Sequence, residues 1–193
     1  MTRTYTLKRR AEQQAETRQR IVEAAVDLHS SVGPAATTMS MLAERAGVQR
    51  HTVYAHFPDE RSLFLACSGR ALERNPLPNA EPWRAIGDTA ARLRVGFAEL
   101  YGWYARNAEF ARCVLRDAET HPLTREINGL RIEPAMAGYR ELLGVGLTTT
   151  QRAVLHLALG FPAWRALVRE SGLTQEEAVD AMVQAVMCCA GAD

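Results

Sequence analysis

The sequence lacks a strong excess of charge of either sign. Its 193 residues hold 23 basic and 22 acidic side chains, which leaves a formal net charge of +1 at pH 7. No apolar run is long enough to span a bilayer, and the first 20 residues are too polar for a secretory signal. We therefore expect a cytoplasmic protein that does not engage membranes and holds one medium domain, or a small domain beside a larger one.

Cysteine is also scarce, with four residues at Cys67, Cys113, Cys188 and Cys189. Their spacing fits neither a zinc site nor a CxxC motif, and a disulfide between two adjacent cysteines would be strained. Reduced, mostly buried thiols are expected, with a redox-sensing role for Cys113 as the alternative. We expect no bound metal.

Catalytic motifs are missing as well. The chain contains no GxSxG, no HExxH, no phosphate-binding Walker loop and no carboxylate pair beside an obvious base. Its five histidines are scattered along the sequence. We expect a protein that is not an enzyme and uses no cofactor.

The sequence does show the periodicity of α-helices. Apolar residues recur at spacings of three and four, and neither strand-like alternation nor an internal repeat is present. An all-α fold of nine helices is expected, after about seven disordered residues. The expected helices cover about 10–31, 39–46, 49–57, 58–74, 82–104, 107–119, 123–143, 151–170 with a kink at Pro162, and 174–190.

The most informative segment runs from Thr37 to Pro58 and has the outline of a helix-turn-helix. A Ser- and Thr-rich start offers capping oxygens for the first helix, and Gly47 stands where that helix must end. In the next helix, Val53 and Phe57 are four residues apart and are expected to face a core. The remaining side chains of that helix include Arg, His, Thr and Tyr, which suit contacts with phosphates and base edges in the DNA major groove.

This segment and the helix before it strongly resemble the signature of the TetR family of bacterial repressors. The resemblance covers about the first third of the chain. Its residues are the stretch Thr17-Arg18-Gln19-Arg20-Ile21-Val22-Glu23-Ala24-Ala25, Gly33, Thr38, Leu42, Ala43, Ala46, Gly47, Val48, Thr52, Val53, Tyr54, His56, Phe57, Pro58 and Leu63.

The resemblance implies a nine-helix TetR-like architecture with two domains. Residues 1–62 would form the DNA-binding helix-turn-helix domain, and residues 63–193 a helical domain for ligand binding and dimerisation. It further implies a repressor that binds a palindromic double-stranded DNA operator as a homodimer and is released by a small-molecule inducer. The family commonly grips a phosphate with a lysine early in the fourth helix; here that position is Glu60, and Arg61 is expected to substitute.

Candidate site residues follow from the outward face of the second short helix, the aromatic residues of the C-terminal part and the apolar last helices. Basic residues are concentrated near the N-terminus, where the first 20 residues hold six basic and two acidic side chains that would favour phosphate binding. The candidates for DNA binding are Thr38, Gln49, Arg50, His51, Thr52, Tyr54, His56 and Arg61. The candidates for ligand binding are Phe97, Tyr101, Tyr104, Cys113, Tyr139 and His156. The candidates for the dimer interface are Leu155, Leu159, Leu167, Met182 and Val186.

Other functions remain open from the residues alone. Most aromatic residues in the C-terminal part would serve equally well as core, and both apolar stripes of the last helices would serve as internal packing. A helical protein-interaction module is one alternative, although it would not need Arg, Thr, Tyr and His outward on one short helix. A weakly specific DNA-binding protein is another, although it should be more basic overall.

Overall fold

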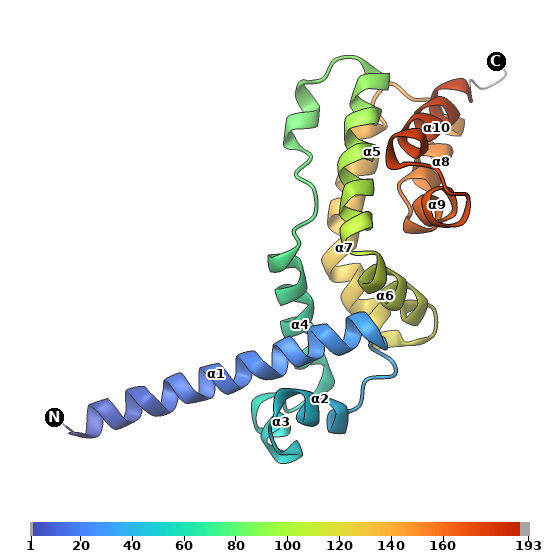
Figure 1. Cartoon of the computed structure of the whole chain (residues 1–193). Helices are drawn as coiled ribbons and strands as arrows, with labels where there is room; N and C mark the ends of the chain where they lie inside the picture. The colour runs from blue at the N-terminus through green and yellow to red at the C-terminus, as the bar shows by residue number, and fades with distance from the viewer. Residues whose placement is uncertain (1, 190–193) are drawn as a thin grey trace. The chain divides into compact units, whose positions relative to one another are not determined.

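A computed structural model describes residues 2–189 of the chain, with side chains from residue 8 onward, and this part contains helices joined by turns and loops but no strand (Figure 1). The all-α expectation is confirmed, but the described residues form ten α-helices rather than nine. These are α1 (Thr2–Ser31), α2 (Met39–Ala46), α3 (Arg50–His56), α4 (Glu60–Arg74), α5 (Thr89–Arg106), α6 (Ala108–Thr120), α7 (Pro122–Leu143), α8 (Thr149–Ala158), α9 (Phe161–Trp164) and α10 (Gln175–Cys188). Two further short turns complete the list: η1 (Glu81–Ala85), a 3₁₀ helix, and η2 (Arg165–Glu170), a π-helix.

The first helix is longer than the sequence predicts. The α1 helix begins at Thr2, eight residues before the predicted start, so the expected disorder is wrong for residues 2–7. Between residues 8 and 20 every side chain is exposed except Thr17, which is partly buried. Packing therefore does not account for the helix between residues 8 and 20, where residues of high helix propensity such as alanine, glutamine, glutamate and arginine favour it.

Two other predicted helices are broken where local backbone geometry intervenes. The predicted helix 82–104 splits, because the 3₁₀ turn η1 ends at Ala85 and Asp88 then caps the start of α5 by accepting a bond from the Ala91 N–H. The predicted helix 151–170 is interrupted at Gly160, whose extended backbone separates α8 from α9. The predicted kink at Pro162 is wrong, because this proline lies in the first turn of α9, where its missing N–H breaks no helical hydrogen bond.

The last helix follows its capping signal. Thr174 accepts a bond from the Glu177 N–H, and the Glu177 carboxylate accepts one from the Thr174 N–H, which completes a capping box before α10. The α10 helix ends at Cys188, whereas the predicted end at residue 190 lies outside the described residues. The four cysteines are free; Cys67 and Cys113 are buried as expected, whereas Cys188 is exposed and Cys189 is only partly buried.

Contacts within the chain define two compact units, the first formed by Met1–Arg74 with Glu109–Arg131 and the second by Asn75–Ala108 with Ile132–Asp193. The first unit has a core in which α1 packs on α2 and α4, built from small and branched residues that include Ile21, Leu42, Val53 and Leu63. These units describe packing and do not test which residues bind DNA, so the functional division at residue 62 stays a prediction.

The second unit is built around α5. This helix packs on α10, on α9 and on η1, and α8 packs on α10. Its largest buried side chains are aromatic or branched and include Trp83, Leu93, Phe97, Tyr101 and Trp164, each no more than 1% exposed. Across residues 2–189, none of the helices combines the length and the hydropathy that a bilayer crossing requires.

Candidate nucleic-acid interface

The helix-turn-helix is defined by caps at both ends of α2. Thr38 is extended and its hydroxyl accepts a bond of 3.2 Å from the Met41 N–H, which satisfies one of the free donors at the helix start. Gly47 ends the helix in the left-handed region, at φ 64° and ψ 42°. The N–H of Val48 then reaches back 2.9 Å to the Ala43 carbonyl and closes the turn. These bonds fix the angle at which α3 leaves α2.

The α3 helix is short and sharply two-sided. Val53 and the following Phe57 are fully buried in the core of the first unit, as the sequence predicts. The exposed positions are Gln49, Arg50, His51 and Tyr54, and Thr52 and His56 are half-buried beside them. One face therefore anchors the helix and the other presents hydrogen-bonding side chains to solvent.

Arg50 and Tyr54 form a pair along this outer face. They are one helical turn apart, and an Arg50 guanidinium N–H donates to the Tyr54 hydroxyl at 3.2 Å. The guanidinium carbon also lies 5.7 Å from the centre of the phenol ring. The tyrosine is 42% exposed, which is unusual for a large aromatic side chain without a partner. The pair restricts the arginine while leaving most of its donors unused.

The α1 helix borders the same surface. The Arg18 guanidinium lies over the Phe57 ring at 4.4 Å, so it covers the end of α3 with a cation–π contact. Thr17 and Arg20 line a shallow hollow together with residues of the turn and of α3, including Gln49 and Thr52. Basic side chains of α1 are thus continuous with the outer face of α3, and in Figure 1 the blue N-terminal half of α1 extends beyond α2 and α3.

Arg61 is engaged differently from the other candidates. Its Nε–H donates to the Glu126 carboxylate at 2.8 Å, and both side chains are about half exposed. An exposed ion pair of this kind contributes less than about 1 kcal/mol, so a phosphate would compete with the carboxylate for the same guanidinium. The predicted role of Arg61 therefore requires exchange of this partner.

Comparison with known sequences connects this geometry to a family. Residues 21–67, which comprise the last third of α1, all of α2 and α3 and the first half of α4, match the family model described as bacterial regulatory proteins, tetR family. This segment of the chain is a TetR-family helix-turn-helix. The first unit therefore contains the family's helix-turn-helix, with the outer face of α3 where the sequence predicts it.

Curated TetR-family relatives match over limited segments. The transcriptional repressor KstR of Mycolicibacterium smegmatis is 39% identical over 106 residues, which cover 55% of this chain and 52% of that protein. The transcriptional regulator AcrR of Shigella flexneri is 42% identical over 57 residues, which cover 29% of this chain and 26% of that protein. The chain thus matches about a quarter to half of the length of these relatives.

Solved structures of TetR-family type share the fold over most of the chain. A transcriptional regulator from Rhodococcus sp. RHA1 superposes with a TM-score of 0.64 at 21% identity, over 89% of this chain and 96% of that one. A TetR-like regulator from the same source gives a TM-score of 0.63 at 20% identity, over 89% and 93% of the two chains. At this identity the likeness establishes the fold, including the helical second part.

The candidate ligand residues do not gather at one site. Phe97, Tyr101 and Tyr104 are neighbours along one buried face of α5, with ring centroids 5.9 Å and 6.4 Å apart in sequence order. Cys113 belongs to the first unit, where its thiol lies 3.5 Å from the Ser30 carbonyl. His156 is exposed on α8. The six candidates therefore reduce to an aromatic group in the second unit.

The tyrosine hydroxyls of this group are already bonded to backbone carbonyls. Tyr101 donates to Ala158 at 2.9 Å and Tyr104 donates to Leu159 at 2.7 Å, so α5 is tied to the end of α8. Tyr139 donates to the Pro78 carbonyl. Burial raises the pKa of Tyr139 to about 12 and that of the other two tyrosines further, so all three stay protonated donors at neutral pH. They would bind a ligand only after releasing these carbonyls.

The candidate interface residues differ in how far they are buried. Leu155, Leu159 and Val186 are at most 1% exposed and lie inside the second unit, where they fill the core between its helices. Leu167 and Met182 are half-buried. The exposed apolar side chains of the same helices are others, Leu157 at 64% and Met187 at 38%.

Sequence reasoning missed Arg18 as a candidate site residue, and it gave Arg92 only as one of several possible polar contacts in the C-terminal part. Arg18 is part of the family-like segment. Its stacking on Phe57 depends on the way α1 crosses α3, which the spacing of residues in the sequence does not predict. Arg92 is 7% exposed, which no pattern predicts for an arginine one turn into a helix. Its position after a polar loop was the only sequence signal available.

Proposed function

We propose that this TetR-family regulator is a transcriptional repressor that inserts α3 into the DNA major groove. The single observation that carries the proposal is the two-sided α3 helix, in which Val53 is buried and Arg50, His51 and Tyr54 are exposed. A helix that is anchored by one face and presents hydrogen-bonding groups on the other is the arrangement that major-groove recognition requires.

The side chains of α3 divide into base-reading and phosphate-binding roles. Gln49, Arg50 and His51 stand at the start of α3, the end that enters the groove most deeply in helix-turn-helix complexes. Arg50 is suited to two hydrogen bonds with a guanine edge, and Gln49 to an adenine edge. Tyr54, with the half-buried Thr52 and His56, would bind phosphates.

Phosphate contacts would also come from residues that flank α3. Thr38 is exposed at the start of α2, where free N–H groups already favour an anion. Arg61 would exchange Glu126 for a phosphate. The exposed basic residues of α1, Lys8, Arg9 and Arg10, would extend the positive surface along the duplex.

We further propose a homodimer on a palindromic operator. Two recognition helices related by a two-fold axis would reach successive major grooves about 34–36 Å apart. The relatives named as transcriptional regulators and repressors support this proposal. Because several predicted interface residues are core, the pairing surface would use the exposed side chains of α8 and α10, together with Leu167 and Met182.

A small-molecule inducer would act by shifting a population between DNA-competent and DNA-incompetent states. A ligand that prefers the incompetent state tenfold weakens operator binding by about 1.4 kcal/mol. The aromatic group of the second unit supplies an apolar lining for such a ligand, provided that its hydroxyls exchange partners.

The test is fluorescence anisotropy with DNA from the region upstream of the protein's own gene, random DNA of equal length and fixed near-physiological salt. We expect selective binding of the upstream DNA, and we expect Arg50→Ala to weaken it by about 1–3 kcal/mol because a bidentate base contact is lost. Arg165→Ala, which removes an exposed arginine of the second unit, is the matched control and should leave affinity unchanged.

The outcomes separate the competing functions. Equal and weak binding to both DNAs would favour a weakly specific DNA-binding protein. No binding to either DNA by a folded protein would favour a helical interaction module. An Arg50→Ala variant with undiminished selectivity would remove Arg50 from the recognition surface.

A further inference from the structure

Arg92 is a buried charge in the second unit without an acidic partner. It is 7% exposed and makes no ion pair with any side chain between residues 8 and 189. Its guanidinium donates to the Ile86 carbonyl at 2.8 Å, the Val145 carbonyl at 3.1 Å and the Thr89 hydroxyl at 3.4 Å. All three acceptors are neutral, so the hydrogen bonds hold the guanidinium in place without balancing its charge. Buried charges are normally paired, because burial removes the water that would stabilise them.

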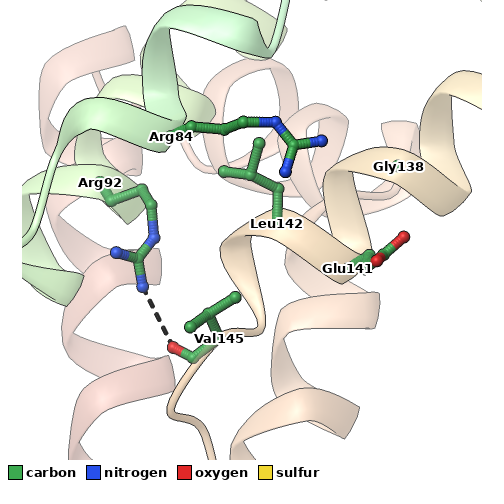
Figure 2. Close-up of a pocket in the computed structure, with 6 residues that line it drawn as sticks. All are labelled: Arg84, Arg92, Gly138, Glu141, Leu142 and Val145. Carbon is green, nitrogen blue, oxygen red and sulfur yellow. Dashed lines mark hydrogen bonds between the residues drawn. The ribbon is translucent and has the colours of Figure 1, made fainter.

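A hollow opens beside this charge. It has a volume of about 220 Å³ and lies between η1, the start of α5 and the end of α7. In Figure 2, Arg84 comes from η1 and Arg92 from the start of α5. Leu142 comes from the end of α7, and Val145 from the turn after it. Arg84 is exposed and is paired with Glu81 from its own turn, an interaction that a ligand can replace at small cost. Two guanidinium groups therefore line one small cavity.

The other lining groups restrict what the hollow can hold. Leu142 and Val145 are apolar, and Val145 is 59% exposed, so a ligand with an aliphatic part would cover it. Glu141 also lines the hollow, and its negative charge would repel a multiply charged anion more strongly than a singly charged one. Gly138 has no atom near the position of an added Cβ, which leaves that wall open.

We propose that this hollow binds a monocarboxylate with a short aliphatic chain. The carboxylate would accept hydrogen bonds from Arg92 and Arg84, whose planar forks match its two oxygens, and the chain would pack on Leu142 and Val145. The ligand would supply the negative charge that Arg92 lacks. None of the aromatic residues of α5 lines this hollow. Binding of the carboxylate does not depend on the proposed function; only a regulatory effect of that ligand on DNA binding would rest on it.

The experiment is isothermal titration calorimetry of the full chain, without DNA, using hexanoate as the probe and hexanamide as its uncharged isostere. We expect hexanoate to bind and hexanamide to bind at least tenfold more weakly. Arg84→Gln should weaken hexanoate at least tenfold, while Glu141→Gln should leave it equal or tighter. Arg106→Gln, which removes an exposed arginine elsewhere on α5, is the matched control and should change nothing.

Each contrary result overturns the proposal. Hexanoate that does not bind, or that binds Arg84→Gln as tightly as the unaltered chain, excludes a carboxylate at this hollow. Inorganic phosphate that binds more tightly than hexanoate excludes the preference for a single charge. Arg84→Gln preserves the bonds of Arg92 to the backbone, so loss of folding does not confuse the result. Because no DNA is present, failure here leaves operator recognition untouched, and failure of operator recognition leaves this site untouched.

Discussion

His29 is a buried imidazole inside the first unit, near the end of α1. It is 4% exposed, its ring centre lies 4.8 Å from that of Phe64, and its Nδ1 lies 3.5 Å from the Cys67 thiol. The pKa of His29 is lowered from 6.5 to about 4, chiefly by burial, with Asp117 opposing the shift and His121 adding to it. The folded protein therefore keeps this ring neutral at pH values where an unfolded chain would protonate it.

This histidine makes stability depend on pH. Between pH 6.5 and about 4 the unfolded state binds a proton at His29 that the folded state does not, so the free energy of unfolding falls as the pH is lowered. The full effect is on the order of 3 kcal/mol. We expect urea unfolding from pH 7.5 to 4.5 to show a shallower pH dependence in His29→Gln. His156→Gln, at an exposed site on α8, should keep the original slope; equal slopes in all three proteins would show that His29 does not titrate in this way.

Residue chemistry that depends on neighbours from distant parts of the chain is hard to predict from the sequence. Asp117 illustrates this, because its carboxylate accepts bonds from the Ala35 N–H and from Arg116, and these partners lower its pKa although burial opposes them. The sequence places Asp117 near the end of an expected helix, but not beside residue 35. The same argument covers Arg92, whose carbonyl partners lie in two separate turns.

At the scale of elements, the turn between α2 and α3 depends on Gly47. Its positive φ of 64° places any other residue in a strained conformation. We expect Gly47→Ala to lower the free energy of unfolding by about 1–2 kcal/mol. Gly129→Ala is the matched substitution in the same unit, because that glycine lies inside α7 with no atom near the added Cβ. It should raise stability by roughly 0.5–1 kcal/mol. Chemical denaturation of both variants measures the contrast, and two changes of the same sign would contradict it.

The exposed part of α1 is the second element with a measurable consequence. Lys8, Arg9 and Arg10 are exposed, and the helix continues to Arg20 beside α3. If these three residues neutralise phosphates, replacing all three with glutamine should reduce the slope of log affinity against log salt by about 2–3 for each subunit bound, or about 5 for the proposed homodimer. Anisotropy titrations at several salt concentrations give the slope.

The control for this measurement is a triple substitution of exposed arginines in the second unit, Arg106, Arg165 and Arg169, to glutamine. It removes the same charge and should leave the slope unchanged. A reduction of equal size in both triple variants would mean that overall charge, and not the α1 extension, determines the salt dependence.

Local signals explain which elements the sequence predicts well. The bounds of α2 and α3 lie within a residue or so of expectation, because Thr38 and Gly47 act on their own immediate backbone. Gly160 was missed as a break because its extended backbone matters only when α9 turns away from α8. The extension of α1 was missed because a polar helix without a packed face leaves no hydrophobic periodicity.

For the whole molecule, the central question is how two chains pair. Leu157 is the most exposed large apolar side chain among the described residues, at 64%, and it lies on α8. Met187 on α10 is 38% exposed. Leu155, by contrast, faces the interior two residues earlier on the same helix. The sequence predicts an interface on these two helices but does not distinguish their outward stripe from their inward one, because both are apolar.

This distinction yields a prediction about assembly. We expect Leu157→Asp to raise the dimer dissociation constant at least about tenfold, because a charge would be buried at the proposed interface. Sedimentation equilibrium of the purified chain measures the constant. Leu130→Asp provides a matched control, since Leu130 is 53% exposed on α7 in the first unit. Dimerisation unaffected by Leu157→Asp would exclude this stripe of α8 from the interface.

The exposed α1 extension has one more property, which concerns labelling. Lys8 is the only lysine in the sequence, since the other basic side chains are arginines. It is solvent-exposed, beyond the last buried contact of α1. Apart from the terminal amine, an amine-reactive dye thus finds a single attachment point, adjacent to the surface proposed to meet DNA. A fluorophore at Lys8 would report the protein–DNA distance by energy transfer, and it would require no engineered cysteine.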